Sequence, residues 1–493
     1  MYAIERAQMI ELEKKAIEEF KIPSVVLMEN AAMGFVRALK QEYGETKNKK
    51  ICILCGKGNN AGDGYAIARL LFFGGAQVSI LPVFDEKSLT GDALTNATAA
   101  KNMGISFINE LHCEYDIIID AIFGTGFHGN VDESVKEIIE KANSSNAYVA
   151  SVDVPSGVSL EADTGETFIK CDLCVTFGYA KFGQFTGLAQ GSFKKLVVAP
   201  ISIPQPESSY PIITKDTYSL LPERASISHK GTFGKVLAYV GSCGMAGAAV
   251  LSGGAVLKSG AGMLTLAVPD SIIPTIVHEL PSAMTLPVED GTDITQKAHG
   301  MDALLMGCGL GTSERTKEAV FSLINCGKPS VIDADGLNIL SQNIDIIKDK
   351  SVILTPHIAE FSRLCGVSVA DITKNPVKHL SNFCSRFSVC VVLKDAVTLI
   401  CDKGESFAVC HAPNSGMATA GSGDVLAGII TAMLSQGLSP FAAACAGVYV
   451  HSAAGKLAKE KLGEAGMLSS DILNFVPQAF VAPCDIAPHI KEL

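Results

Sequence analysis

No stretch of this sequence approaches the roughly 18 uninterrupted apolar residues that a membrane-spanning helix needs. The first residues, MYAIERAQMIELEKK, are charged and lack the apolar core of a secretory signal peptide. These two absences predict a cytoplasmic protein with no membrane partner. Basic side chains are also scarce, because 40 Lys and Arg stand against 51 Asp and Glu, a net charge of −11. A general nucleic-acid partner, which requires basic surface, is therefore not expected.

A disulfide framework is not indicated either. The 15 cysteines are odd in number and are scattered through apolar runs, so we interpret them as small buried hydrophobic residues. Two CxxC spacings occur, Cys52/Cys55 and Cys171/Cys174, and both lie in strand-like segments. An offset of three in a strand directs side chains to opposite faces, which argues against a zinc site.

What the sequence does contain is a globular composition, 48% hydrophobic and 18% charged, over 493 residues. That length is too great for one ordinary core. Apolar strand-like segments alternate with helical segments, the pattern of a parallel sheet covered by helices on both faces. A proline-rich polar stretch over 199–225 interrupts the alternation, which resumes near 229. We therefore expect two α/β domains, residues 1–215 and 216–493.

The expected elements follow from the periodicity of apolar residues. In the first domain we expect two helices within 5–40 broken at Pro23, further helices at 91–103 and 131–143, and strands within 50–55, 76–83, 114–126 and 147–157. In the second domain we expect strands within 234–242, 262–268, 302–307, 329–335, 351–357 and 389–396, and a helix after the glycine turn at 420.

Three polar loops follow successive strands of the first domain. They are GKGNNAGDG (56–64), GTGFHGN (124–130) after Asp120, and Asp153-Val-Pro-Ser156-Gly157. Ligands of open α/β sheets bind at the edge formed by the carboxyl ends of the strands, where these loops lie. Each loop alone is also explained by a capped turn, but three in order favour an oxygen-rich pocket. Asn60, Asp120 and Ser156 are hard oxygen donors suited to an alkali or alkaline-earth ion.

The most informative element of the second domain is AGSGDVLAG (420–428), a glycine turn that opens a helix. Free amides and the helix dipole at such a turn attract an anion such as a phosphate. Asp424 would repel that phosphate, so its presence indicates a general base acting on a hydroxyl that attacks phosphorus. The alternative is an ordinary helix-capping aspartate.

The first-domain motifs KGNNAGDG, DAIFGTG and VDVPSG resemble, in this order, the NAD(P)H-hydrate epimerase family, which has a Rossmann-like three-layer αβα fold. The family usually has NNGGDG, so Ala61 is a departure that disfavours a positive φ there. The resemblance implies K⁺ on Asn60, Asp120 and Ser156. It implies NADHX and NADPHX, the hydrated cofactors, as substrates bound by Asn59, Asn60, Ala61, Gly62, Asp63, Gly124, Thr125, Gly126, Phe127, His128, Gly129, Asn130 and Asp153.

The residue types suit that reaction. Inverting C6 of the hydrated nicotinamide ring breaks and remakes a bond to that carbon, helped by the electron pair of the ring nitrogen. Asp153 is expected to be catalytic, either transferring the proton or stabilising the cationic intermediate. Lys181, within FGYAKFG (177–183), is a lesser candidate for the same site.

The second domain resembles the dehydratase branch of the ribokinase-like superfamily, whose fold is α/β. The motifs that carry the resemblance are HKGTFGKVLAYVGS (229–242), KSGAGMLTLAV (258–268), MGCGLG (306–311), DADGLN (333–338), TPHIAE (355–360), KDAVT (394–398) and NSGMATAGSGD (414–424). The resemblance implies that Ala261, Gly309, His357 and Asp424 contact the substrate, with Asp424 catalytic. It implies a nucleotide on Lys394, Asp395, Ala396, Val397, Thr398 and Gly423.

Two departures from the dehydratase pattern stand out. Ile358 and Ala359 replace the family's Pro-Gly, and Asp395 replaces a glycine, where a carboxylate must point away from the phosphates. The resemblance implies ADP as phosphoryl donor in bacterial-type enzymes and ATP in eukaryotic ones, and the fused domain order favours ADP. Mg²⁺ is expected beside the nucleotide phosphates. The whole would be a metabolite-repair enzyme, an isomerase fused to a lyase, and we expect a homo-oligomer.

Two other functions are compatible with these motifs. Kinases of the ribokinase-like superfamily share the GxGD turn and the fold, so the first alternative is a small-molecule kinase with the N-terminal half as an accessory. The second alternative makes the first domain a noncatalytic ligand-binding module. The complete set of Asn60, Asp63, Asp120, Asp153 and Ser156 argues against a noncatalytic first domain.

Overall fold

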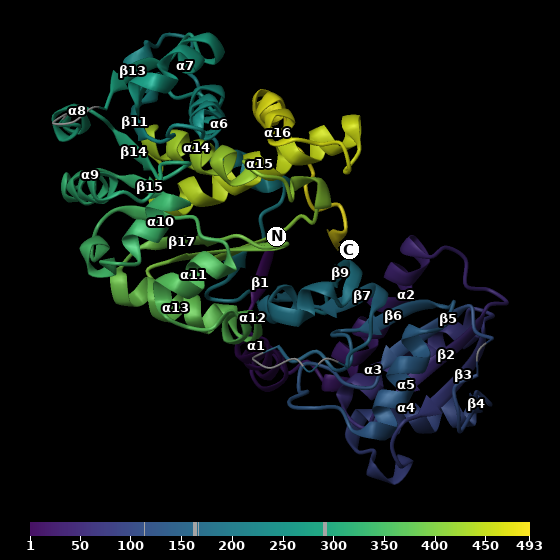
Figure 1. Ribbon diagram of the computed structural model, residues 1–493. Helices are drawn as coiled ribbons and strands as arrows, with labels where there is room; N and C mark the ends of the chain where they lie inside the picture. The colour runs from purple at the N-terminus through teal and green to yellow at the C-terminus, as the bar shows by residue number, and fades with distance from the viewer. Residues whose placement is uncertain (113, 161–164, 166, 289–292) are drawn as a thin grey trace. The chain divides into compact units, whose positions relative to one another are not determined.

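The computed structural model describes residues 1–112, 114–160, 165, 167–288 and 293–493. The chain divides into two compact units (Figure 1). The first unit comprises residues 2–210 together with 488–493, and the second comprises residue 1 and residues 211–487. The division falls slightly before the expected boundary at 215. The expectation also assigned residues 488–493 to the second domain, whereas they return to the first unit because their backbone pairs with an edge strand there.

The first unit is built on an eight-stranded, entirely parallel sheet in the order β20-β9-β7-β6-β5-β2-β3-β4. The strands in that order are Ile490–Glu492, Phe193–Ala199, Cys171–Phe177, Tyr148–Val152, Ile117–Ala121, Lys50–Cys55, Gln77–Pro82 and Ser106–Phe107. Central strands β2 and β5 are almost wholly buried because helices cover both faces of a parallel sheet. The predicted three-layer Rossmann-like domain is confirmed.

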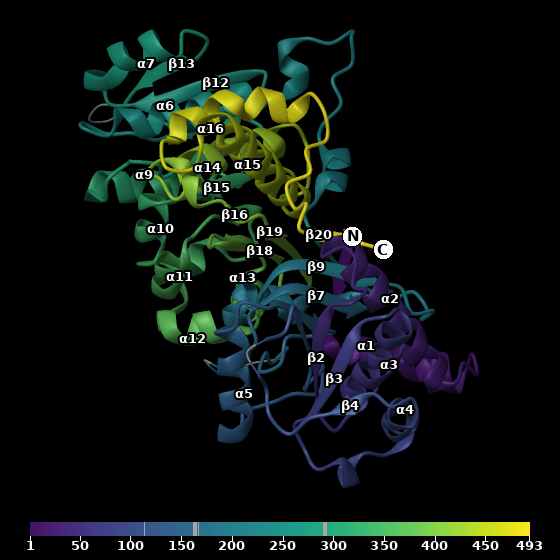
Figure 2. The same cartoon turned by 90° about the vertical axis from the view of Figure 1, so that its right-hand side faces the viewer.

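The helices of the first unit are α1 (Arg6–Glu18), α2 (Ser24–Glu42), α3 (Asn59–Phe73), α4 (Gly91–Asn102) and α5 (Glu133–Asn143). Pro23 separates α1 from α2, as predicted. The strand order reverses between β2 and β5, so right-handed crossovers place α3 and α4 on one face and α5 on the other (Figure 2). Short strands β1 (Tyr2–Ile4) and β8 (Ala180–Lys181) also pair in parallel.

The second unit has a nine-stranded sheet in the order β13-β12-β11-β14-β15-β16-β17-β18-β19. Its strands in that order are Met284–Pro287, Met263–Val268, Lys235–Tyr239, Ala303–Met306, Ser330–Ile332, Val352–Leu354, Cys390–Leu393, Val397–Asp402 and Ser406–His411. The pairs from β13 to β17 are parallel, and β18 and β19 add an antiparallel edge. The sequence prediction missed β13 and this edge hairpin.

The principal helices around this sheet are α6 (Ala246–Lys258), α9 (Glu314–Asn325), α11 (Ile358–Cys365), α13 (Pro376–Phe387), α14 (Ser422–Ser435) and α15 (Pro440–Leu462). The shorter ones are α7 (Ile273–Glu279), α8 (Thr295–His299), α10 (Asp335–Leu340), α12 (Val369–Lys374) and α16 (Ser469–Phe475). Helices α6 and α14 pack unusually closely, since a Cβ on Gly428 would come within 2.3 Å of the Ser252 carbonyl oxygen. Small residues therefore allow α14, which carries the glycine turn, to lie against the sheet.

The cysteines behave largely as interpreted. All those in the described ranges are free thiols, and most are buried, including Cys52, Cys55, Cys171 and Cys174. Cys243 is exposed and departs from the interpretation. Among the helices of the described residues, none combines the length and apolar character needed to cross a bilayer.

Candidate functional sites

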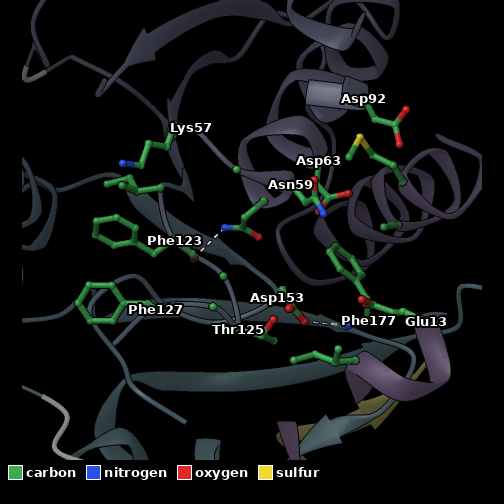
Figure 3. A pocket seen from close by; sticks show the side chains of 18 of the residues that line it. Glu13, Lys57, Asn59, Asp63, Asp92, Phe123, Thr125, Phe127, Asp153 and Phe177 are labelled. Atoms are coloured by element: carbon green, nitrogen blue, oxygen red, sulfur yellow. Dashed lines mark hydrogen bonds between the residues drawn. The ribbon is translucent and has the colours of Figure 1, made fainter. Parts of the chain in front are cut away.

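A cavity of about 700 Å³ opens in the first unit where the loops after β2, β5 and β6 meet (Figure 3). The cavity walls include these predicted residues: Asn59, Asn60, Asp63, Gly124, Thr125, Gly126, Phe127, His128, Asn130 and Asp153. Further walls come from α1, from Lys57 and Phe84, and from Phe123, whose ring stacks on Phe127 with centroids 4.6 Å apart. The three polar loops thus form one pocket, as their order along the chain predicted.

Ala61 and Gly62 lie elsewhere. Both belong to the first turn of α3 and are buried, and neither lines the cavity. Ala61 has helical backbone geometry rather than a positive φ, so its replacement of glycine introduces no strain. Gly129, which does have a positive φ, is also outside the cavity wall.

Two of the three predicted metal ligands, Asn60 and Ser156, contact one backbone carbonyl, and the third, Asp120, contacts Ser156. The Nδ2 atom of Asn60 donates to the Phe123 oxygen at 2.8 Å, and the Ser156 hydroxyl lies 3.4 Å from the same oxygen. That hydroxyl also donates to Oδ1 of Asp120 at 2.5 Å. The Oδ1 atom of Asn60 is buried without a hydrogen-bond partner in the described part of the chain. A free, buried acceptor of this kind fits a cation.

Asp120 is fully buried below this group. It accepts hydrogen bonds from the Ser151 hydroxyl at 2.9 Å and from the Ser156 amide at 2.8 Å, in addition to the Ser156 hydroxyl. Burial raises the pKa of its carboxyl, and these hydrogen bonds oppose the rise. No side-chain cation pairs with Asp120 among the residues the structure describes.

Asp153 follows β6 with a φ of +63°, which is unusual for a residue other than glycine. Its Oδ1 accepts from the Lys181 ammonium at 2.6 Å, the Thr176 hydroxyl at 3.0 Å and the Phe177 amide at 3.2 Å. The Gln184 amide donates to the Asp153 carbonyl at 3.0 Å. These contacts hold the strained backbone and fix one carboxyl oxygen, while the residue still lines the cavity.

Lys181, the lesser candidate, contacts Asp153 but does not itself line the cavity. Its side chain is 1% exposed, and its ammonium group also donates to the Thr176 hydroxyl at 2.8 Å and the Phe177 carbonyl at 2.9 Å. All three protons are therefore used within the protein. Lys181 positions Asp153 and is not among the residues lining the cavity.

Glu13 of α1 is a site residue that the sequence prediction missed. It lines the cavity together with Asp63 of α3 and Asp153, so three carboxyl groups from three elements share one pocket (Figure 3). The signal was present in the sequence, because Glu13 lies four residues after buried Met9 and three before buried Ala16, on the apolar face of its helix. A glutamate on that face calls for a functional explanation.

The carboxyl groups of Glu13 and Asp63 are electrostatically coupled to Asp153. Burial raises the pKa of Asp63 well above its ordinary value, and the charges of Asp153 and Glu13 raise it further. Burial and the charge of Asp153 likewise raise the pKa of Glu13, whereas Lys181 lowers both values. The raised pKa values of Glu13 and Asp63 favour retention of protons on these two carboxyl groups.

In the second unit, α14 begins directly after Gly421, and no side chain in the described part of the chain caps its first amides. Asp424 lies in the first turn, with Gly423 beside it. A Cβ on Gly423 would lie 3.2 Å from the Lys394 ammonium and 3.6 Å from Oδ2 of Asp333. The predicted base, the predicted nucleotide-binding lysine and the predicted glycine turn are therefore neighbours.

Lys394 pairs with Asp333, another residue that was not singled out from the sequence. Its ammonium group donates to Oδ1 of Asp333 at 2.8 Å, and the Thr355 hydroxyl donates to the same oxygen at 2.8 Å. Burial would lower the pKa of Lys394, but the adjacent carboxylate outweighs burial and raises it. Asp333 directly follows β15, and its position at a strand end was the available signal in the sequence.

The Asp424 carboxyl is buried enough for its pKa to rise to about 6, chiefly through loss of solvent and then through the charge of Asp333. A hydrogen bond from the Cys308 thiol and the charge of Lys394 oppose this rise. Donor atoms of Cys308, Asp333 and Asp424 all lie within 4.8 Å of one another. A group with a pKa near neutrality is suited to general-base catalysis.

The remaining predicted residues of this unit vary in position. His357 is exposed and caps α11, accepting from the amide of Ala359 at 3.1 Å. Gly309 has a φ of +60°, and a Cβ there would lie 2.7 Å from that of Ala248. Asp395 and Ala396 are exposed in the turn between β17 and β18, Val397 and Thr398 begin β18, and Ala261 is buried. The exposed Asp395 is compatible with a nearby phosphate.

A buried histidine also supports the glycine turn. Nε2 of His451 on α15 lies 3.2 Å from the Ser422 hydroxyl at the start of α14. Burial lowers the pKa of His451 to about 4, so the ring is neutral at physiological pH. This contact was not expected from the sequence.

Comparison with known families accounts for both units. The family described as NAD(P)H-hydrate dehydratase matches residues 236–478, and the family described as YjeF-related protein N-terminus matches residues 24–183. A bifunctional NAD(P)H-hydrate repair enzyme of Moorella thermoacetica is 35% identical over 97% of this chain and 96% of its own. The chain belongs to the family of bifunctional NAD(P)H-hydrate repair enzymes. The member from Escherichia coli is 33% identical over 94% of this chain and 90% of its own.

The fold of the second unit agrees with membership of this repair family. A ribokinase-like superfamily protein of Enterococcus faecalis, solved by crystallography, is 25% identical with a TM-score of 0.50. It covers 55% of this chain and 95% of its own. The ribokinase-like fold predicted from the second set of motifs is therefore confirmed.

Proposed function

We propose that this chain repairs NADH and NADPH damaged by hydration, through two reactions carried out by its two units. The first unit interconverts the R and S forms of the hydrates, and the second dehydrates the S form with ADP as phosphoryl donor. The observation that carries the proposal is that each unit has a carboxyl group beside a glycine-containing turn, Asp153 directly after β6 and Asp424 in the first turn of α14. Relatedness to repair enzymes along nearly the whole chain supports it.

Epimerisation needs a cation-stabilising group beside C6 of the nicotinamide ring. Loss of the C6 hydroxyl as water, driven by the electron pair of N1, gives an iminium ion. Asp153 supplies a negative charge at the cavity wall, and Lys181 and Thr176 orient that charge from behind. A preoriented charge requires no reorganisation as the cation forms, which is the basis of its catalytic effect.

We assign a K⁺ site to Asn60, Ser156 and Asp120, with the Phe123 carbonyl as a further oxygen donor. The free Oδ1 of Asn60 and the buried Asp120 carboxyl fit a monovalent cation. The bound ion would supply positive charge where the loops after β5 and β6 meet. The Asn59–Asp63 turn and the 124–130 loop would then bind the rest of the dinucleotide.

Dehydration needs a better leaving group than hydroxide. Asp424 removes the proton of the C6 hydroxyl while that oxygen attacks the β-phosphorus of ADP, so that AMP leaves and a phosphate ester forms. The N1 electron pair then expels phosphate, and loss of a C5 proton completes the ring of NAD(P)H. Lys394 and the amides of α14 balance the charge of the nucleotide. Carboxyl oxygens of Asp333 and Asp424 fit Mg²⁺, which would supply further neutralisation of the phosphates.

The two reactions complement one another, because spontaneous hydration gives both epimers and a stereospecific dehydratase consumes one. The test incubates the full chain with a mixture of R and S hydrates and either ADP or ATP, following the absorbance of the reduced nicotinamide. Complete recovery with ADP is expected. Asp153→Asn should stop recovery at the S fraction, and Asp424→Ala should abolish it. Recovery that stalls in the unaltered chain would exclude epimerisation.

The small-molecule kinase alternative makes the opposite prediction, a stable phosphorylated product with no return of reduced nicotinamide. Relatedness to repair enzymes in both units favours repair. The homo-oligomer expected from the sequence stays a prediction.

A further inference from the structure

The first-unit cavity contains two carboxyl groups that the protein itself leaves unpaired. Within the described residues, no hydrogen bond or ion pair engages the carboxyl of Glu13 or of Asp63, although both are half-buried. Asp153 differs, because three donors hold its Oδ1. Half-buried carboxyl groups without hydrogen-bond partners lose solvation, and no donor of the protein replaces the lost water. The free-energy cost of burying the carboxyl groups of Glu13 and Asp63 is explained if both act on a ligand in the cavity.

The same cavity has an independent sign of ligand binding, the buried Oδ1 of Asn60 that lacks a partner. Glu13 and Asp63 reach the cavity from different helices, α1 and α3. Inversion at a carbon requires a group to leave from one face of the ring and return on the other. A reaction in which water does both needs a proton donor on one face and a proton acceptor on the other.

On the basis of the proposed epimerase function, we infer that Glu13 is a further catalytic residue and forms a two-carboxyl proton-transfer pair with Asp63. Glu13 protonates the C6 hydroxyl, the C6–O bond breaks, and water departs as the N1 electron pair forms the N1=C6 bond. A water on the opposite face attacks C6, Asp63 takes its proton, and the electron pair returns to N1. The balance is one water lost, one gained and one proton moved from Glu13 to Asp63.

The pair works in both directions. After one inversion Asp63 holds the proton and Glu13 is ionised, which is the state required to convert the product back. Burial and the charge of Asp153 raise the pKa of both carboxyls, which favours the bound proton that the pair transfers, and the charge of Lys181 opposes this rise. Asp153 is then free to stabilise the cation. The other charged residues lining the cavity are Arg6, Lys57, Asp92, His128 and Asp132.

The test compares Glu13→Gln with Glu11→Gln in the full chain. Glu11 lies on the exposed face of the same helix, so its variant is a matched control. The kcat for R to S conversion is expected to fall about 100-fold or more in Glu13→Gln, with little change in KM, and to be unaltered in Glu11→Gln. Wild type should have a bell-shaped pH profile that Glu13→Gln loses, because two interacting groups no longer titrate.

Dehydration of pure S hydrate by the same preparation reports an intact second unit. If Glu13→Gln does not fold, Glu13→Asp replaces it, and a kcat below about one tenth of wild type with a displaced pH profile supports the inference. Inversion in water labelled with heavy oxygen should place solvent oxygen on C6 at every turnover. Wild-type kcat in Glu13→Gln, a change in KM alone, or inversion without label would overturn it. Absence of epimerisation in the unaltered chain would instead refute the proposed function.

Discussion

The ammonium group of Lys181 lies 2.6 Å from Oδ1 of Asp153, and its charge also lowers the pKa of two further carboxyl groups of the first-unit cavity, Glu13 and Asp63. The lysine is almost fully buried, with its three protons donated to Asp153, Thr176 and Phe177. It therefore keeps Asp153 oriented and limits the mutual repulsion of Asp153, Asp63 and Glu13.

Replacing Lys181 by Met should destabilise the first unit and stop epimerisation. Removing one partner of a buried ion pair leaves an uncompensated charge, which costs about 3–5 kcal/mol in the free energy of unfolding. Denaturant unfolding of the full chain measures the change. Lys194→Met is the matched control, because Lys194 forms an exposed pair with Asp172 and should contribute less than about 1 kcal/mol. Equal effects of the two substitutions would show that the Lys181 pair has no special structural role.

Dehydration should depend on the ionisation of Asp424. The pKa of this carboxyl is raised to about 6, and a general base must be ionised, so kcat/KM should rise with pH through that region. The Cys308 thiol hydrogen bond lowers this pKa. Cys308→Ala should therefore move the rising limb to higher pH by roughly half a unit, since a hydrogen bond contributes about 0.5–1.5 kcal/mol.

Cys308→Ser provides the control for that shift. It keeps a donor of similar size beside Asp424, so its rising limb should lie at or below that of the unaltered chain. The measurement is the pH profile for dehydration of the S hydrate by the full chain. Identical profiles for the Ala and Ser variants would mean that the thiol does not tune Asp424.

The sequence was sufficient for those features that repeat a local pattern. Apolar runs ending in glycine loops predicted β2, β5 and β6, and their parallel pairing brought Asn60, Asp120 and Asp153 to one sheet edge. Glu13 was missed because its significance depends on which helix face meets the cavity. Asp333 was missed because its pairing with Lys394 joins residues far apart in sequence. Strand β20 was missed because three residues are too few to show a pattern of apolar and polar positions. They form a strand because they pair with the edge of β9.

The proposed K⁺ site predicts a cation requirement that two substitutions remove. Epimerisation by the unaltered chain should need K⁺, and K⁺ should raise the unfolding midpoint of the first unit, because a ligand that binds only the folded state stabilises it. Asn60→Ala and Ser156→Ala should lose both effects. Asn59→Ala, which alters the neighbouring wall residue, should keep the thermal response to K⁺ while raising KM. A thermal response that persists in Asn60→Ala and Ser156→Ala would place the ion elsewhere.

The return of residues 488–493 to the first unit predicts that this unit depends on the end of the chain. Strand β20 covers the edge of β9 through hydrogen bonds from the Leu196 amide to the His489 carbonyl at 2.8 Å and from the Leu493 amide to the Val198 carbonyl at 3.0 Å. Lys491 also pairs with Glu42 of α2 at 2.7 Å, and together with Lys195 it lowers the pKa of that carboxyl.

Deleting residues 488–493 exposes the unpaired edge of β9 to solvent and removes that ion pair. The unfolding midpoint of the first unit should fall by several degrees, and the deleted protein should aggregate more readily, while dehydration of the S hydrate is retained. Lys491→Ala separates the two contributions, because it removes a half-exposed ion pair alone and should cost less than about 1 kcal/mol. A deletion variant as stable as Lys491→Ala would mean that strand pairing contributes nothing. A fragment that ends at residue 210 also lacks β20. Low epimerase activity in such a fragment would therefore reflect its missing edge strand rather than an incomplete active site.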